Sequence, residues 1–233
     1  MKKNNLILGA FLAITVILFS SFGASSASNS PSTEKVEGST ESTVSAGVVT
    51  IGSQVWTSTN LNVSTYRNGD IIPEVRDAKA WDTLTTGAWC YYDNDPANGT
   101  KYGKLYNWYA VNDPRGLAPN GYHIPTDAEW KKLSAYLGGE KKGKKMKSTS
   151  GWYNNGNGTN RSGFSGLPGG YREDHGDSSH FYAIEYYGNW WGSAEGSANL
   201  AWGRGLSYYN GDIDRQSFNM IYCTGSSVRC IRD

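Results

Sequence analysis

The sequence predicts an α+β domain with short antiparallel strands, one or two helices and long loops. Short runs of β-prone residues are separated by pairs that contain Gly or Asn, which is typical of tight hairpins. One segment, residues 126–137, carries both a start and a stop signal for an amphipathic helix. A long stretch rich in Gly and Asn, residues 151–170, predicts loop structure. Few helices among short strands and long loops suit the α+β class.

The first 27 residues have the pattern of a secretory signal peptide. Two lysines precede an apolar run at residues 6–19, and Ser25 and Ala27 suit the small-residue positions before a cleavage site. The run of about 14 residues is shorter than the roughly 20 that cross a bilayer as a helix. We therefore expect residues 1–27 to be removed and the protein to be secreted or held at the cell surface without spanning the membrane.

Residues 28–46 are rich in Ser, Thr and Glu and contain no aromatic residue. Such a composition buries too little apolar surface to offset the entropy of ordering the chain, so we expect a disordered tether. Residues 47–233 have the size of one domain. The chain has 22 basic and 21 acidic residues, and loss of the two signal lysines leaves 20 and 21. This balance gives no electrostatic reason to expect a nucleic-acid partner.

The domain begins with a predicted hairpin. β-prone runs at residues 48–51 and 54–57 flank a pair that starts with Gly52. Further along, Asp77 predicts the N-cap of a short helix that reaches Leu84.

The best-marked helix begins after Thr126. Glu129 lies three residues later, which is the spacing of a capping box, and Gly138 predicts the end. The apolar positions at helical spacing are Trp130, Leu133 and Leu137. We expect this amphipathic helix to pack on a sheet.

Five lysines lie between residues 141 and 147. We interpret this segment as a solvated loop, and an anion site is the alternative.

Residues 206–215 predict a second hairpin with Asn210-Gly211 at its tip. Aromatic residues crowd this half of the chain, and adjacent tyrosines on one strand point to opposite faces, so at least one is expected to be exposed. Neighbouring amide, carboxylate and guanidinium groups could hydrogen-bond a sugar or peptide that stacks on the ring. The candidate ligand-binding residues are Tyr208, Tyr209, Asn210, Asp212, Asp214 and Arg215.

Five segments in order carry a family resemblance. They are VVTIGSQVWTSTN (48–60), GKLYNWYAVNDPRGLAPNGYHIPTDAEWKKLSAYLGG (103–139), GFSGLPGGYR (163–172), NWWGSAE (189–195) and SSVRCIRD (226–233). Together they resemble the Fibrobacter succinogenes major paralogous domain family over nearly all of residues 47–233. The resemblance implies a C-type-lectin-like fold and an exported or surface-attached protein, and it defines no activity. Ser226 stands where the family pattern Gly-Phe-Ser-Val-Arg-Cys has Phe, which puts local strand packing in question.

The resemblance also bears on the three cysteines. It favours a disulfide between Cys90 and Cys230, because the fold it implies brings the last strand beside the early part of the domain. A bridge between Cys223 and Cys230 and three reduced thiols are the alternatives. An exported protein lies in a compartment where disulfides persist.

No residue pattern indicates a catalytic centre or requires a cofactor. Asp93-Asn94-Asp95 alternates oxygen ligands as calcium favours, but it lacks a glycine-centred loop that ends in a bidentate Glu. We interpret it as a turn held by side-chain hydrogen bonds, with a structural calcium ion as the alternative. The polar residues at 174–180 match no zinc signature, and we expect a loop there. We expect His123 to make a structural hydrogen bond.

These observations predict an exported binding or adhesion module that is not an enzyme. The expected ligand is an extracellular glycan or protein. The alternatives are an accessory domain of a carbohydrate-active or modifying enzyme system and a structural component of the cell envelope.

Overall fold

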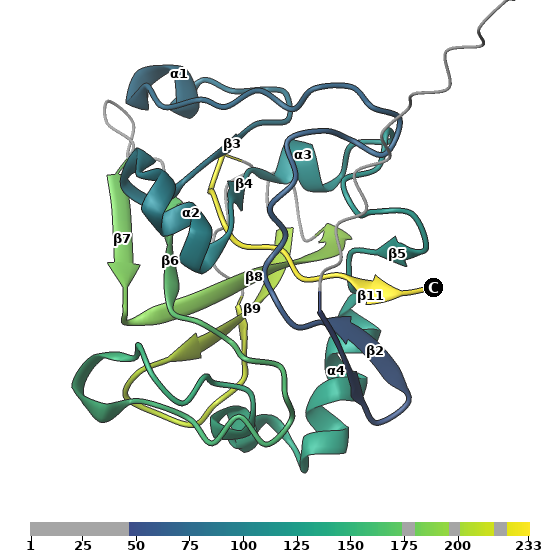
Figure 1. Cartoon of the computed structure of the whole chain (residues 1–233), viewed down its shortest axis with the longest axis vertical. Coiled ribbons are helices and arrows are strands. Elements are labelled where there is room, and N and C mark those ends of the chain that lie inside the picture. The colour runs from purple at the N-terminus through teal and green to yellow at the C-terminus, as the bar shows by residue number, and fades with distance from the viewer. Residues whose placement is uncertain (1–46, 174–179, 196–200, 217–222) are drawn as a thin grey trace, which may run out of the picture. The chain divides into compact units, whose positions relative to one another are not determined.

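Short strands and short helices make up the part of the chain that the structure describes, residues 47–173, 180–195, 201–216 and 223–233 (Figure 1). In the computed structural model the strands are β1 (Val48–Ile51), β2 (Gln54–Thr57), β3 (Trp89–Cys90), β4 (Leu105–Tyr106), β5 (Tyr122–His123), β6 (Gly169–Glu173), β7 (His180–Ile184), β8 (Tyr187–Glu195), β9 (Ala201–Ser207), β10 (Asp214–Gln216) and β11 (Ile231–Arg232). The α-helices are α1 (Ala78–Asp82), α2 (Pro96–Tyr102), α3 (Trp108–Val111) and α4 (Asp127–Leu137), and 3₁₀ helices lie at η1 (Tyr92–Asn94), η2 (Glu140–Lys145) and η3 (Tyr153–Asn155). This composition confirms the α+β class. The predicted signal peptide (1–27), the tether (28–46) and residues 174–179 lie outside the described residues.

The strands form three sheets with the orders β1-β2-β11-β5, β10-β9-β8-β6-β7 and β3-β4. All described strand pairs are antiparallel except β6 with β8. In the first sheet Ile231 of the last strand pairs with Trp56 on one side and with His123 on the other. The two ends of the domain therefore lie side by side (Figure 1).

The first hairpin is confirmed with the predicted strands. Ile51 faces Gln54 across the turn, and Gly52 has a φ of 64°, a left-handed conformation that favours glycine. The side-chain amide of Gln54 donates to the backbone oxygen of Glu129, which fastens the hairpin to α4.

Helix α4 also follows the prediction. The Thr126 hydroxyl accepts from the backbone N–H of Glu129, and the Glu129 carboxylate accepts from the backbone N–H of Thr126. Gly138 ends the helix in the left-handed conformation. The buried face of α4 packs in one cluster with residues of β1, β2, β8 and β9, as expected of an amphipathic helix on sheets.

Helices α2 and α3 exceed the one or two helices that the sequence predicted. Asp95 caps α2 and Pro96 occupies its first position, while the Asn107 side chain caps α3 by accepting from the Ala110 N–H. These helices are short, so they show little hydrophobic periodicity. No helix in the described ranges is long and apolar enough to cross a membrane.

Tryptophans fill the core. Trp56 packs against Trp130 with ring centroids 4.7 Å apart, and Trp108 packs against Trp191 at 5.4 Å. Trp190 is buried as well, so both members of the adjacent pair Trp190 and Trp191 belong to the core. Large rings supply buried area with few residues, which suits a domain with short secondary structure.

The second hairpin exists, but its connection is longer than predicted. β9 pairs with β10 through Gly205 and Asp214, and residues 206–213 reverse the chain instead of a two-residue turn at Asn210-Gly211. The Asn210 side chain accepts from the hydroxyl of Ser207 and from the backbone N–H of Asp212, which holds a wide loop. Local turn residues therefore indicated the reversal but not its width.

Candidate functional site

Five tyrosines from three loops meet at one surface. Tyr153 lies in η3, Tyr186 and Tyr187 lie where the chain passes from β7 into β8, and Tyr208 and Tyr209 follow β9. We call this group the tyrosine surface. The sequence singled out Tyr208 and Tyr209 as ligand-binding candidates and missed Tyr153, because nothing local shows that its loop folds against them.

The rings form a continuous contact chain. Tyr153 and Tyr186 are stacked with centroids 4.4 Å apart and planes 22° apart. Tyr208 meets both rings edge-on, at 5.6 Å and 5.1 Å, and Tyr209 lies 5.4 Å from Tyr208 and 6.3 Å from Tyr187. Tyr209 is 63% exposed and Tyr153 is 46% exposed, so two rings of the chain, one from each of two loops, face solvent. The expectation that at least one ring of the 208–209 pair is exposed is confirmed for Tyr209.

Backbone hydrogen bonds hold the three loops in place. The N–H of Tyr153 donates to the oxygen of Glu185 at 2.8 Å, and the N–H of Tyr208 donates to the oxygen of Tyr186 at 2.9 Å. A Cβ at Gly156 would lie 2.8 Å from the Tyr208 Cα and closer still to its carbonyl oxygen. Glycine at this position is what lets the η3 loop approach the tyrosines.

The prediction that all the lysines of residues 141–147 lie in a solvated loop is wrong for Lys147. Its side chain is 1% exposed, and its ammonium donates to the backbone oxygens of Ser207 at 2.9 Å and Asn210 at 3.0 Å. Burial lowers the pKa of Lys147 to about 8. Two carbonyl groups of the wide loop draw this lysine inward, so it supports the segment that carries Tyr208 and Tyr209.

Three of the predicted polar ligand residues make contacts within the domain. Asn210 organises the wide loop, and Asp212 forms an ion pair of 2.6 Å with Lys141. Arg215 donates to Asp127 at 2.9 Å and lies 3.6 Å above the ring of Trp202.

Asp214 is the predicted polar residue that remains available to a ligand. Its carboxylate is half-buried, and no hydrogen bond joins it to another described residue. Burial, followed by the charge of Asp212, raises its pKa above the ordinary value. Asp214 pairs with Gly205 of β9, and Ser207 of the same strand pairs with Tyr187.

His123 bridges two carboxylates near the C-terminus. Its Nδ1 lies 2.7 Å from Asp233 and its Nε2 lies 2.8 Å from Glu129. Burial opposes protonation, but the two hydrogen bonds outweigh it and raise the pKa of His123. The predicted structural hydrogen bond is confirmed, and it ties β5 to α4.

The Asp93–Asp95 segment forms the predicted tight turn. Asp93 and Asn94 have φ values of 53° and 55°, and the Asp95 carboxylate accepts from the N–H of Ala97. Within the described ranges, no group of three or more His, Cys, Asp or Glu side chains has the arrangement of a metal site.

A known family spans this domain. The model of the family described as Fibrobacter succinogenes major domain matches residues 49–232. The chain belongs to this family. Neither a curated protein nor a solved structure matches it. Membership in the Fibrobacter succinogenes major domain family confirms the sequence resemblance, while the C-type-lectin-like fold stays a prediction.

Three of the five segments that carry the resemblance, 48–60, 189–195 and 226–233, meet at Asn60 of this Fibrobacter succinogenes major domain. The Asn60 amide oxygen accepts from Trp190 Nε1 at 2.8 Å and from Arg229 Nε at 2.7 Å. Its amide nitrogen donates to the Tyr102 oxygen at 2.7 Å and to the Ser227 hydroxyl at 3.2 Å. One side chain thus joins segments that are up to 169 residues apart.

Ser226, where the family pattern has Phe, is fully buried between paired backbones. Its N–H and oxygen both pair with the backbone of Tyr106. Its hydroxyl has no hydrogen-bond partner among the described residues. The strand therefore keeps its pairing despite the departure, but with an unsatisfied polar atom.

The predicted Cys90–Cys230 disulfide is not present, since all three cysteines are free thiols. In the β3–β4 ladder Trp89 points into the cluster that contains Cys230, whereas Cys90 points to the opposite face, beside Leu105. Strand alternation therefore points the Cys90 side chain away from the cluster in which Cys230 is buried. Burial raises the pKa of Cys90 and of Cys230 to about 12, so both thiols stay protonated at neutral pH.

Proposed function

We propose that this protein is an exported, non-catalytic binding module that takes a neutral carbohydrate chain on its tyrosine surface. The signal-like N-terminus and the tether-like segment after it support a place outside the cytoplasm, secreted or at the cell surface. The observation that carries the proposal is the chain of five neighbouring rings in which Tyr153 and Tyr209 are exposed.

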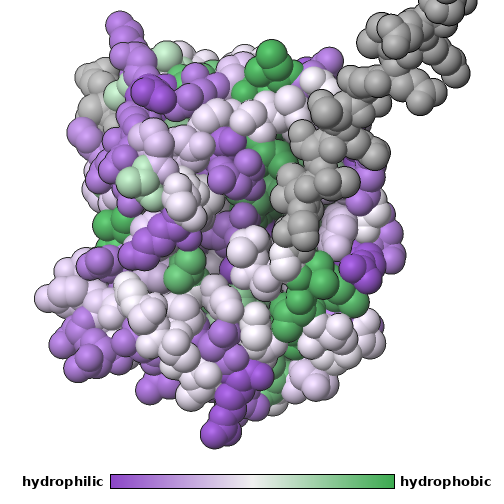
Figure 2. Space-filling model, viewed as in Figure 1, coloured by the Kyte–Doolittle hydropathy of each residue, from purple (hydrophilic) through white to green (hydrophobic). Residues whose placement is uncertain are grey.

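The chemistry of the surface favours a sugar over an apolar partner. A sugar ring offers a C–H face that packs on an aromatic ring, and its hydroxyls hydrogen-bond at the ring edge. Tyrosine supplies both a flat apolar body and a polar tip. Asp214 adds a carboxylate acceptor on β10, in the same sheet as Tyr187. On the face shown in Figure 2, hydrophobic residues lie in separate patches, without the broad apolar area typical of a tight protein interface.

Binding of neutral oligosaccharides of four to six sugars to the full-length chain tests the proposal, with tryptophan and tyrosine fluorescence as the readout. We expect Tyr209→Ala to weaken binding about tenfold, because a lost aromatic contact of about 1.4 kcal/mol corresponds to that factor. Asp214→Asn should weaken it by a smaller factor.

Tyr136→Ala is the matched control. Tyr136 is 65% exposed, as Tyr209 is at 63%, but it lies on α4 outside the tyrosine surface. Equal loss in both variants, or binding that survives Tyr209→Ala, would contradict the proposed surface. Turnover of an oligosaccharide by the chain would contradict the non-catalytic role.

A further inference from the structure

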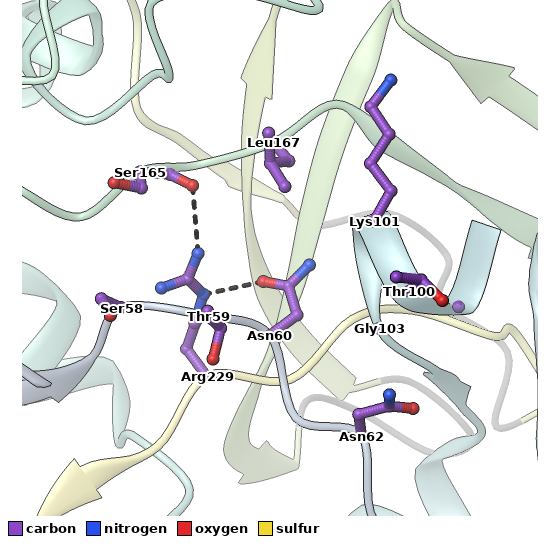
Figure 3. Close-up of a pocket in the computed structure, with 11 residues that line it drawn as sticks. Ser58, Thr59, Asn60, Asn62, Thr100, Lys101, Gly103, Ser165, Leu167 and Arg229 are labelled. Atoms are coloured by element: carbon purple, nitrogen blue, oxygen red, sulfur yellow. Dashed lines mark hydrogen bonds between the residues drawn. The ribbon is translucent and has the colours of Figure 1, made fainter. Parts of the chain in front are cut away.

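A separate pocket lies where the segments around Asn60, Gly103, Ser165 and Arg229 meet (Figure 3). Its volume is about 500 Å³, within the range of small-molecule sites. The lining residues are Ser58, Thr59, Asn60, Asn62, Gly99, Thr100, Lys101, Gly103, Ser165, Leu167 and Arg229. None of them belongs to the tyrosine surface.

The charged side chains that line this pocket are all positive. Lys101 and Arg229 are its charged lining residues, and no carboxylate is among them. Figure 3 shows Arg229 joined to the Asn60 side chain and to the backbone oxygen of Ser165 on one side of the pocket. Lys101 lies on the other side, and its exposed side chain extends away from Arg229. A cavity lined by positive groups attracts an anion.

Arg229 carries a buried charge without an ion pair among the described residues. Its three acceptors are neutral: the Asn60 amide at 2.7 Å, the Thr57 oxygen at 2.7 Å and the Ser165 oxygen at 3.1 Å. Burial lowers the pKa of Arg229 to about 9, which still leaves the guanidinium charged at neutral pH. An uncompensated charge in a low dielectric is costly, and an anion placed in the adjoining pocket would reduce that cost.

The remaining lining offers hydrogen bonds. The side chains of Ser58, Thr59 and Asn62 make no hydrogen bond to another described residue, so they can bind a ligand. Ser165 has a φ of 54°, an unusual conformation for a residue with a side chain, and two hydrogen bonds with Asn160 hold it there. Such held backbone strain is often found at binding sites.

We propose that this pocket binds a small acidic sugar, with the carboxylate near Lys101 and Arg229 and the ring hydroxyls on Ser58, Thr59 and Asn62. The volume suits one or two sugar rings, and the mixture of hydroxyl and amide groups with positive charge matches a hydroxylated carboxylate better than a bare inorganic anion. The site is independent of the tyrosine surface, because the two share no residue.

Calorimetric titration of the full-length chain with D-glucuronate tests this site, with D-glucose as the neutral probe and acetate and inorganic phosphate as anion probes. We expect glucuronate to bind at least tenfold more tightly than each of the other three. Lys101→Gln should weaken glucuronate binding about three- to tenfold. Lys132→Gln on α4 removes the same charge away from the pocket and should leave the affinity unchanged.

Two further variants separate this proposal from structural effects and from the proposed function. Arg229→Lys keeps the charge and should retain more affinity than Arg229→Gln, while Lys101 is exposed and its variant should fold normally. Tyr209→Ala should not alter glucuronate binding. Equal binding of glucose, equal binding of acetate or phosphate, no binding of glucuronate at millimolar concentration, or no effect of Lys101→Gln would each overturn the site.

Discussion

Arg229 donates a hydrogen bond of 2.7 Å from Nε to the Oδ1 of Asn60, and both side chains are buried. The same oxygen accepts from Trp190 Nε1, so one amide oxygen serves two buried N–H groups that have no other acceptor among the described residues. This arrangement makes Asn60 the residue through which the early part of the domain, β8 and the C-terminal segment are joined.

Replacement of Asn60 should therefore destabilise the whole domain. We expect Asn60→Ala to lower the free energy of unfolding by at least about 3 kcal/mol, because it leaves several buried polar groups without partners. Urea denaturation measures the change. The exposed neighbour Asn62 is the control, and Asn62→Ala should stay within about 0.5 kcal/mol of the parent protein. Similar values for the two variants would contradict the role assigned to Asn60.

The buried hydroxyl of Ser226 predicts a stabilising substitution. Ser226→Ala removes an unsatisfied polar atom, and we expect a gain of about 1 kcal/mol in unfolding free energy. Ser227→Ala is the matched change at the next residue, and it should destabilise because the Ser227 hydroxyl accepts from Asn60. Thermal unfolding of the two variants distinguishes them, and a loss of stability in Ser226→Ala would show that its hydroxyl is satisfied in solution.

Protonation of His123 should make stability depend on pH. The pKa of His123 is raised in the folded protein, so the folded state holds the proton more tightly than the unfolded state does. This contribution is fully present below the ordinary value of about 6.5 and is lost as the pH rises through the folded pKa. Denaturation midpoints between pH 5 and pH 8.5 should fall over that window. The fall should be smaller in His123→Gln, and an unchanged profile in that variant would exclude His123 as the source.

Glycine at position 156 should be required for the three loops of the tyrosine surface to pack together. A Cβ there would collide with the backbone of Tyr208, so we expect Gly156→Ala to cost about 1–3 kcal/mol. The near-ultraviolet circular dichroism of the stacked tyrosines should change as well. Gly211→Ala in the same loop system is the control, since its nearest contact would be 3.4 Å from the flexible side chain of Lys144. A Gly156→Ala variant with unaltered tyrosine signals would contradict this account of how the loops approach each other.

Local signals predicted the elements that depend on neighbouring residues. The β1–β2 hairpin and the capped helix α4 agree with the structure because a turn residue or a capping pair acts within a few positions of the chain. The short helices α2 and α3 were missed, although Asp95 and Asn107 cap them, because four to seven residues carry too little periodicity.

Long-range packing decided the rest. Tyr153 joins Tyr186 and Tyr208 only because three loops fold together, and Lys147 is buried only because distant carbonyl groups accept its hydrogen bonds. The cysteine pairing failed for the same reason. The register of β3 and β4 turns Trp89 toward the cluster that contains Cys230 and turns Cys90 to the opposite face, so Cys90 faces away from Cys230.

The sequence by itself determined the α+β class, the family, the first hairpin and the main helix. It also singled out Tyr208 and Tyr209 as candidate ligand-binding residues. Only the tertiary structure decided that five tyrosines form one surface, that Asn60 joins the domain, and that Arg229 stands in the wall of a positively charged pocket. The physical reason is the distance along the chain between the residues that interact. Turn and cap preferences are set by adjacent residues. The ring cluster instead joins separate loops between Tyr153 and Tyr209, and the pocket joins Asn60 and Arg229, which are 169 residues apart.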